Sequence, residues 1–480
     1  MKKKVLFVAF EGLPFIKTGG LADVVYALPK ALDTNLFEVQ VVLPLHKKIK
    51  EKWQDKLSYL DHFSVISGYI NEEANVYSLV NEGVEYLFIE NATFFDRDNV
   101  YGYGDDACRY SFYNVSVLEM MIKLNLYPDI IHTHDYHTAV LPALCKYRFN
   151  QNKHIARIKH IFTIHNLAYQ GSYSKQVLFD FLAFDYKYYD QGLLRYDNAC
   201  NFMKIGIECS DIVTTVSKTY AEEIKTREGG NGLDSILSQR ADKLYGIVNG
   251  IDINAWNPQT DNKIAVNYNL NNVHKKKVLN KLALQKKLGL KEDKDALLIG
   301  MVSRLTFQKG AELLLNTFNT ILDSGVQIAI LGTGEERFES GFRYMEEKNK
   351  GKAVYYCGYN DALAHEFYAG LDILMMPSLF EPCGISQLIA MRYGTLPLVR
   401  ETGGLKDTVE PYNEYEHSGR GFTFGPYNQE DMLKVLKIAI DVYNNSKDDF
   451  KLLIDNAMSY DVSFDTSARE YEDLYKKLLD

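Results

Sequence analysis

One stretch near the N-terminus decides the fold class: residues 5–10 (VLFVAF), the loop 11–20 (EGLPFIKTGG), the segment 21–32 (LADVVYALPKAL) and residues 39–43 (VQVVL). A short apolar run that leads through a glycine-containing loop into an amphipathic segment and then a second apolar run is typical of a β-loop-α-β unit. Such units build parallel sheets covered by helices. The stretch therefore predicts an α/β fold.

The same pattern continues along the chain and then starts again. Further apolar runs follow at 86–89, 130–132, 161–164, 212–216 and 244–248. A second series has an apolar run at 296–302, a loop at 303–310, a helical pattern at 311–322, and apolar runs at 326–331, 353–357, 373–376 and 396–399. Because open parallel sheets bind ligands outside the carboxyl ends of their strands, we expect two Rossmann-like domains facing each other across a deep cleft.

The expected boundaries follow from where the pattern pauses. Residues 257–272 are polar and lack clear periodicity, which favours a hinge there between a first domain at 1–256 and a second at 273–465. Residues 466–480 have apolar residues near helical spacing. We expect a C-terminal helix that either closes the second domain or crosses back to the first.

Composition excludes several classes of protein. The formal net charge is 54 − 63 = −9, and no stretch is dense in Lys and Arg, which disfavours a nucleic-acid partner. No run approaches the ~20 apolar residues that span a bilayer. The basic and apolar start has only six apolar residues before Glu11, so we interpret it as a buried strand and expect a cytoplasmic protein without a membrane partner. The six cysteines show no C-x-x-C spacing.

Candidate site residues of the first half lie in loops that follow predicted strands. Lys17, Gly19 and Gly20 stand just before a predicted helix, where exposed backbone N–H groups and a lysine suit a phosphate. The loop is neither a Walker A motif nor G-x-G-x-x-G, so a plain tight turn stays open. After another strand, His165 and Asn166 are good donors to a sugar hydroxyl or a phosphate oxygen, although a single histidine there is more often structural.

Three histidines and a carboxylate crowd into residues 131–138 (IHTHDYHT). A zinc hydrolase with a metal site built on His132, His134 and His137 is the alternative hypothesis, but the sequence shows no second cluster of His and Asp to complete such a site. The plainer interpretation is that one or two of these histidines satisfy backbone groups at the end of a strand.

The second half carries its candidates in the same kind of loop. Arg304 and Lys309 stand five residues apart before a helix, where Arg can grip a phosphate with two hydrogen bonds and Lys adds a point charge. Glu381 precedes Pro382, and proline suits the first position of a helix, so we expect the carboxylate at a helix N-terminus. There it could hold sugar hydroxyls, stabilise positive charge on an anomeric carbon, or simply cap the helix. Residues 402–405 (TGGL) again offer backbone N–H groups for phosphate.

Taken together, these motifs resemble those of bacterial glycogen synthases and plant starch synthases, which are retaining glucosyltransferases of the two-Rossmann-domain GT-B type. The resemblance covers residues 5–425, and the combination of motifs in this order along the chain is highly specific. The motifs are KTGGL (17–21), the stretch 132–137, HNLAYQG (165–171), TVS (215–217), NGID (249–252) with WNP (256–258), RLTFQKG (304–310), the stretch 376–384, AMRYGT (390–395) and TGGL (402–405).

The resemblance implies a function and roles for individual residues. It implies ADP-glucose as the donor, the non-reducing end of an α-1,4-glucan as the acceptor, and no metal or other cofactor. Lys17, Arg304 and Lys309 match positions that serve the diphosphate, whereas Asp135, His165, Asn166 and Glu381 match positions that line the glucose site, with Glu381, Lys309, Arg304 and His165 expected to be catalytic. Further positions expected to bind substrate are Gly19, Gly20, Asp23, Asn249, Gly332, Gly334, Tyr356, Cys383, Gly384, Thr402, Gly403 and Gly404.

Two departures and three alternatives accompany the resemblance. Tyr136 stands where the family often has Trp, which alters an aromatic wall of the sugar site, and the N-terminal half has fewer helix-rich insertions than plant enzymes. A UDP-glucose or sucrose-type transferase of the same fold, a metal hydrolase at the three histidines, and a non-catalytic glucan-binding protein are the competing hypotheses. Acceptor length, oligomeric state and allosteric control cannot be predicted from the sequence.

Overall fold

The computed structural model describes residues 2–480 and divides the chain into two compact units. The first unit holds residues up to Asn249 together with Phe464–Asp480, and the second holds Gly250–Ser463. Among residues 2–480, no helix is both long enough and apolar enough to cross a membrane.

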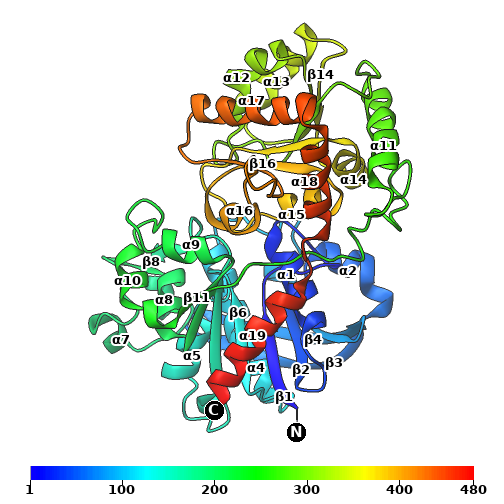
Figure 1. Ribbon diagram of the computed structural model, residues 1–480. Coiled ribbons are helices and arrows are strands. Elements are labelled where there is room, and N and C mark those ends of the chain that lie inside the picture. The colour runs from blue at the N-terminus through cyan, green and yellow to red at the C-terminus, as the bar shows by residue number, and fades with distance from the viewer. Residues whose placement is uncertain (1) are drawn as a thin grey trace. The chain divides into compact units, whose positions relative to one another are not determined.

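The first unit is built around one mixed sheet (Figure 1). Its strands run in the order β11 (Leu244–Gly246), β10 (Ile212–Thr215), β7 (Lys159–Ile164), β6 (Ile130–His134), β1 (Lys3–Val8), β2 (Phe37–Pro44), β5 (Val84–Glu90), β4 (Ile70–Asn81) and β3 (Ser58–Ser67). All neighbours are parallel except β5 with β4 and β4 with β3. The apolar runs predicted as strands lie in β1, β2, β5, β6, β7, β10 and β11.

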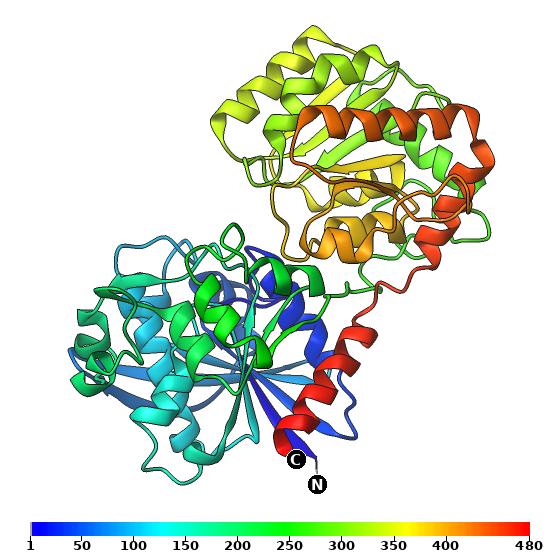
Figure 2. The ribbon, with the colours of Figure 1, turned by 60° about the vertical axis from the view of Figure 1, so that its left-hand side comes forward.

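Helices and a small hairpin complete the first unit. The helices are α1 (Gly20–Ala31), α2 (Lys47–Trp53), α3 (Ala92–Phe95), α4 (Asp106–Lys123), α5 (Leu141–Tyr147), α6 (Gln176–Asp180), α7 (Tyr186–Asp190), α8 (Phe202–Cys209), α9 (Lys218–Glu223), α10 (Asp234–Gln239) and α19 (Phe464–Leu479), and the hairpin pairs β8 (Ser172–Ser174) with β9 (Ala199–Asn201). Both views show α19, drawn in red, against this unit, and it contacts α1 (Figures 1 and 2).

The second unit has a wholly parallel sheet. Its strands run in the order β14 (Ala353–Cys357), β13 (Gln327–Gly332), β12 (Leu298–Val302), β15 (Ile373–Met376), β16 (Leu396–Arg400) and β17 (Phe422–Phe424). The helices are α11 (Val273–Leu288), α12 (Ala311–Asp323), α13 (Glu336–Lys348), α14 (Asp361–Gly370), α15 (Ser386–Arg392), α16 (Gly403–Thr408), α17 (Gln429–Asn445) and α18 (Lys447–Ser459). Strand order reverses between β12 and β15, the place where such sheets bind ligands.

The structure divides the chain at other residues than the expected boundaries. Residues 257–272 lie inside the second unit, because Tyr268 is buried in its core and donates a hydrogen bond of 2.7 Å to the Tyr393 carbonyl. The C-terminal helix belongs to the first unit, where the Tyr471 and Tyr475 side chains are fully buried. The chain therefore passes between the units after Asn249 and again after Ser463, and a hinge function for 257–272 stays a prediction.

Candidate functional site

The loop after β1 brings a lysine, two glycines and a buried carboxylate together. Gly19 caps α1 and Gly20 is its first residue, while the Lys17 ammonium lies 2.8 Å from the Asp23 carboxylate. Glu11, which was not among the predicted residues, is almost fully buried and accepts hydrogen bonds of 2.5 Å from both the backbone N–H and the hydroxyl of Thr18. Burial raises the pKa of Glu11 to about 7. Through these two bonds to Thr18, the buried carboxyl group of Glu11 fixes the conformation of the loop.

Asp135 follows β6 in a left-handed conformation, with φ of 56°. Such a backbone costs free energy for a residue other than glycine and is often found at functional sites. Its Oδ1 accepts the backbone N–H of His165 at 2.7 Å and that of Asn166 at 3.4 Å, which joins the loops after β6 and β7. Burial raises the pKa of Asp135 to about 7, with a further contribution from the charge of Glu11. Burial lowers the pKa of His165 to about 3, so its ring is neutral.

Two of the three histidines of residues 131–138, His132 and His137, are packed as structural rings. His132 uses both ring nitrogens, Nδ1 with the Tyr475 hydroxyl at 2.8 Å and Nε2 with the Thr163 hydroxyl at 2.6 Å. His137 packs against both Phe10 and Tyr101, with ring centroids 5.5 and 4.6 Å away. Within residues 2–480, no three His, Cys, Asp or Glu side chains are grouped to hold a metal ion. The geometry gives the zinc alternative no support.

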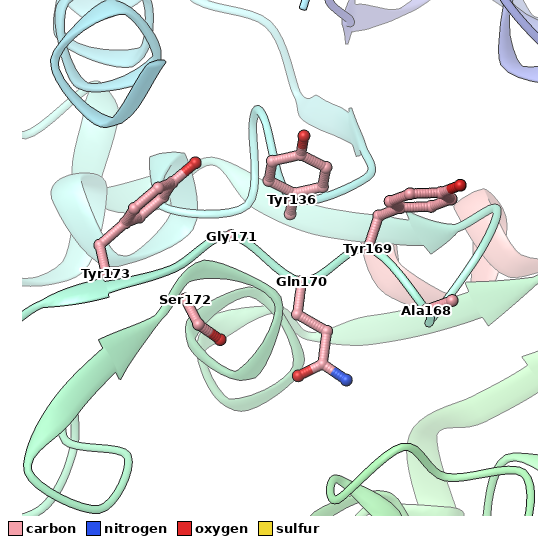
Figure 3. Close-up of a pocket in the computed structure, with 7 residues that line it drawn as sticks. All are labelled: Tyr136, Ala168, Tyr169, Gln170, Gly171, Ser172 and Tyr173. Carbon is pink, nitrogen blue, oxygen red and sulfur yellow. The ribbon is translucent and has the colours of Figure 1, made fainter. Parts of the chain in front are cut away.

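An aromatic pocket of about 420 Å³ lies next to these loops in the first unit. Figure 3 shows the rings of Tyr136, Tyr169 and Tyr173 arranged around the loop at Gly171. Gly171 adopts φ of 63°, and a Cβ atom there would come within 2.6 Å of the Tyr136 ring. Aromatic faces with hydroxyl groups, next to the polar Gln170 and backbone amides, suit a ligand with both apolar faces and hydroxyls.

In the second unit, Lys309 and Glu381 lie on the two sides of the point where strand order reverses. Lys309 follows β12 and Glu381 follows β15. The Lys309 ammonium lies 2.8 and 2.6 Å from the two Glu381 carboxylate oxygens, and the Ser378 hydroxyl donates to the same carboxylate at 3.0 Å. Glu381 is 5% exposed, so the pair is well shielded from water. The structure thus brings these two candidate site residues into contact.

Arg304 differs from Lys309, although the two share a loop. Its side chain is exposed, and its guanidinium has no hydrogen-bond or ion-pair partner within residues 2–480. The loop is held against the end of β13, since the Leu305 N–H donates to the Thr333 carbonyl at 2.9 Å. Gly334 permits this approach, because a Cβ atom there would lie 2.1 Å from the Leu305 carbonyl oxygen. Gly332 ends β13, and Tyr356, on the neighbouring strand β14, is half-exposed.

The expected helix start at Pro382 is wrong. Helix α15 begins at Ser386, because Gly384 adopts φ of 74° and interrupts the helical backbone before it. Glu381 and Cys383 instead lie in a buried loop that packs against Gly403 and Gly404, where a Cβ atom on Gly403 would come within 2.0 Å of the Glu381 carbonyl oxygen. The start of helix α16, with its N-cap Thr402, thus supports the backbone that carries Glu381.

The predicted residues therefore form two groups, one in each unit. The first joins Lys17, Gly19, Gly20, Asp23, Asp135, His165 and Asn166, and the second joins Arg304, Lys309, Gly332, Gly334, Glu381, Cys383, Gly384, Thr402, Gly403 and Gly404. Asn249 stands apart at the end of the first unit, buried and with its Oδ1 unpartnered within residues 2–480.

Comparisons with known proteins match both units. A family model described as the starch synthase catalytic domain matches residues 4–239, and one for glycosyl transferases group 1 matches residues 283–451. The glycogen synthase of Clostridium beijerinckii is 43% identical over 476 residues, covering 99% of each chain, and that of Streptococcus agalactiae is 44% identical over 475 residues. The chain belongs to the glycogen synthase family.

Solved structures agree with this membership. The catalytic domain of starch synthase IV from Arabidopsis thaliana, bound to ADP and acarbose, is 33% identical, covers 100% of both chains and gives a TM-score of 0.90. Sucrose-phosphate synthase from Thermosynechococcus elongatus, at 14% identity and a TM-score of 0.61, shares the fold. The expected two-Rossmann-domain GT-B fold is confirmed, and this member of the glycogen synthase family is a glycosyltransferase.

Sequence reasoning missed some residues of this glycogen synthase family member that support the two groups. Glu11 and Tyr101 lie beside the first group, where Tyr101 is near the charges of Glu11 and Asp135 and burial raises its pKa well above the usual value. Arg400 donates through Nε to the Gly425 carbonyl at 3.0 Å and through Nη1 to the Leu379 carbonyl, next to the Glu381 loop. The available signal was a charged residue that directly follows an apolar run in the sequence, as Glu11 and Arg400 do.

Proposed function

We propose that this protein is a glycogen synthase that transfers glucose from ADP-glucose to the non-reducing end of an α-1,4-glucan with retention of configuration. The observation that carries the proposal is the shielded Lys309–Glu381 pair at the sheet's reversal point, with the exposed cation of Arg304 on the same loop as Lys309. The ADP and acarbose bound to starch synthase IV support the choice of nucleotide and glucan. The expected cytoplasmic location stays a prediction.

In this mechanism, Arg304 and Lys309 stabilise charge as it develops on the departing ADP. The bond from glucose C1 to the phosphate oxygen breaks, and the bond from C1 to the acceptor O4 forms on the same face of the sugar. The proton of the acceptor hydroxyl goes to the leaving phosphate. Glu381 stabilises the positive charge that develops at C1, and its tight contact with Lys309 fixes its direction. Retaining glycosidases use two carboxylates about 5–5.5 Å apart, whereas this proposal needs only one at C1.

The first unit would bind the sugar in the same proposal. His165 and Asn166 offer donors to glucose hydroxyls, and Asp135 aligns the backbone that carries them. The pocket lined by Tyr136, Tyr169 and Tyr173 would take the glucan acceptor. The smaller Tyr136 in place of the usual Trp would leave more room at this wall.

A donor assay tests the function. Wild-type protein, glycogen and either ADP-glucose or UDP-glucose are mixed, and nucleotide release and glucose incorporation are both measured. We expect glucose to be incorporated from ADP-glucose into products that β-amylase degrades. We expect this incorporation to be lost in Glu381→Ala. The control is Glu430→Ala, which alters an exposed carboxylate on α17. Incorporation from UDP-glucose alone would favour the alternative transferase, and glucan binding without release would favour a non-catalytic protein.

The same assay tests the proposed absence of a metal requirement. Because Arg304 and Lys309 supply positive charge on one loop, we expect activity to survive EDTA and exhaustive dialysis. Loss of activity that Mg²⁺ or Zn²⁺ restores would contradict this part of the proposal.

A further inference from the structure

Two histidine rings meet at the carboxyl edge of the first unit's sheet. His134 is the last residue of β6, and His165 is the first residue after β7. Their nearest ring nitrogens, Nδ1 of His134 and Nε2 of His165, lie 3.1 Å apart. Burial lowers the pKa of both rings far below neutral pH, so each ring carries a single proton. One of the two facing nitrogens must therefore donate and the other accept.

The second nitrogen of His134 decides which ring donates. Its Nε2 is buried and has no hydrogen-bond partner within residues 2–480. The ring packs against those of His132 and Phe7, with centroids 4.3 and 5.4 Å away. A buried N–H without an acceptor costs more than an unused lone pair, and orphaned buried N–H groups are rare. The proton of His134 thus belongs on Nδ1, where it points to His165.

The protonation of His165 follows from that of its neighbour. Since its Nε2 accepts from His134, its own proton lies on Nδ1, and no residue within 2–480 bonds to that nitrogen. We propose that His134 is a positioning residue that fixes the tautomer of His165, so that His165 presents its Nδ1–H as a hydrogen-bond donor to a sugar hydroxyl. The assignment of a sugar to His165 rests on the proposed function, whereas the tautomer itself does not.

The surroundings of His134 suit this task, because they leave the ring little freedom. The Thr138 hydroxyl accepts the His134 N–H at 2.8 Å and donates to the His134 carbonyl at 2.9 Å, which fixes the backbone. Stacking on His132 and Phe7 fixes the plane of the ring. His165 is held from its other side, by the bond from its backbone N–H to Asp135. A neutral ring held in this way can set the proton position of its partner.

Nuclear magnetic resonance on the wild-type protein tests the tautomer without any substrate. Long-range ¹⁵N–¹H correlations of ¹⁵N-histidine-labelled protein distinguish Nδ1–H from Nε2–H, and His165→Asn assigns the His165 signals by their loss. We expect the Nδ1–H form for His165 in the wild type and a shift toward a tautomer mixture in His134→Leu. We expect His134→Asn to restore the Nδ1–H form, because its amide N–H can take the place of Nδ1–H. An Nε2–H signal for His165 in the wild type overturns the proposal.

Kinetics add a readout that a purely structural role would not move. We expect His134→Leu to lower kcat with ADP-glucose at least about tenfold, with little change in the KM for glycogen, and His134→Asn to regain most of the loss. The matched control is His160→Leu, another buried histidine whose Nδ1 has no partner within residues 2–480. A His134→Leu protein that turns over like the wild type overturns the positioning role. If the wild type transfers no glucose at all, the proposed function fails, and the spectrum still decides the tautomer.

Discussion

Lys309 and Glu381 show how one residue governs the environment of another in this protein. The carboxylate has a side-chain exposure of 6%, and the lysine, at 20%, is its nearest positive charge. A shielded carboxylate that loses its cation is left uncompensated, which is costly. The lysine therefore has two tasks in the proposed reaction, to orient the Glu381 carboxylate and to meet the charge of the leaving phosphate.

The first prediction concerns Lys309→Ala. We expect kcat with ADP-glucose to fall by about 10²-fold, and by no less than tenfold, because a positioned charge at the leaving group is lost. Circular dichroism and the unfolding midpoint check that the fold is kept. Lys437→Ala, which removes an exposed lysine from α17, is the control. Turnover near the wild-type value would remove Lys309 from the mechanism.

The second prediction concerns the buried carboxyl of Asp135. Its pKa is about 7 in the folded chain, against an ordinary value of 3.8. Between about pH 4 and 7 the unfolded chain is ionised while the folded chain keeps its proton, so the free energy of unfolding falls as pH rises through this window. Asp135→Asn removes that dependence. We expect the free energy of unfolding of the variant, relative to that of the wild type, to rise by about 1–3 kcal/mol as the pH increases from 4.5 to 7.5.

The two tryptophans, Trp53 and Trp256, make this measurable in the first unit alone. In a Trp256→Phe background, the fluorescence of Trp53 reports the urea unfolding of the first unit at each pH. The exposed Asp55→Asn serves as the control. A difference between Asp135→Asn and its parent that stays constant with pH would contradict the prediction.

At the scale of elements, helix α11 shows why part of the fold escaped prediction. Its buried positions are Val273, Lys277, Asn280, Lys281, Leu284 and Gln285, which follow helical spacing but are mostly polar. Apolar periodicity cannot reveal such a helix. The Lys277 ammonium donates to the carbonyls of Tyr368 and Ala369 in α14, to the carbonyl of Tyr393 just after α15, and to the Thr395 hydroxyl. This lysine ties the ends of two helices to a third.

The third prediction is that Lys277→Met destabilises the second unit by about 2–4 kcal/mol, because it leaves buried oxygen atoms without a donor. Trp256 fluorescence in a Trp53→Phe background reports this unit during urea unfolding. The control is Lys275→Met, an exposed lysine in the same helix. Equal midpoints for the Lys277→Met and control proteins would show that the buried ammonium contributes nothing net.

The burial of each strand likewise decided whether it could be predicted from the sequence. Strands such as β1 and β13 are buried on both faces and so appear as continuous apolar runs. The hairpin of β3 and β4 was missed, because it is exposed on one face and alternates buried and exposed residues. The loops of the site could be placed after their strands, but the contact between His134 and His165 depends on the register of β6 with β7, which the sequence does not display.

At the scale of the whole molecule, the first unit is made from two stretches of chain. Helix α19 covers this unit through Tyr475, which lies 5.5 Å from the Phe37 ring by centroid distance and bonds to His132. The Glu472 carboxylate accepts the Asp33 N–H at 2.7 Å, and the Ser467 hydroxyl donates to the Val248 carbonyl at 2.6 Å. The last residues of the chain are therefore part of the core that supports the candidate glucose site.

The fourth prediction is that Tyr475→Ala lowers the free energy of unfolding of the first unit by about 3–5 kcal/mol, through the cavity left by a fully buried ring. Trp53 fluorescence in the Trp256→Phe background measures this change, and the second unit, followed by Trp256 in the Trp53→Phe background, should keep its midpoint. Lys476→Ala, on the exposed side of the same helix, is the control. Equal loss in both units would show that they unfold together.

The returning helix also sets an order for synthesis on the ribosome. Residues 250–463 all emerge before Phe464, so the second unit can finish while the first still lacks its closing helix. At about 5–20 residues per second, the nascent first unit waits for about 10–40 seconds with Phe37 and the ring of His132 uncovered. The N-terminal half of this protein is thus the last part to be completed, and chaperones that shield apolar surface would act on it longest.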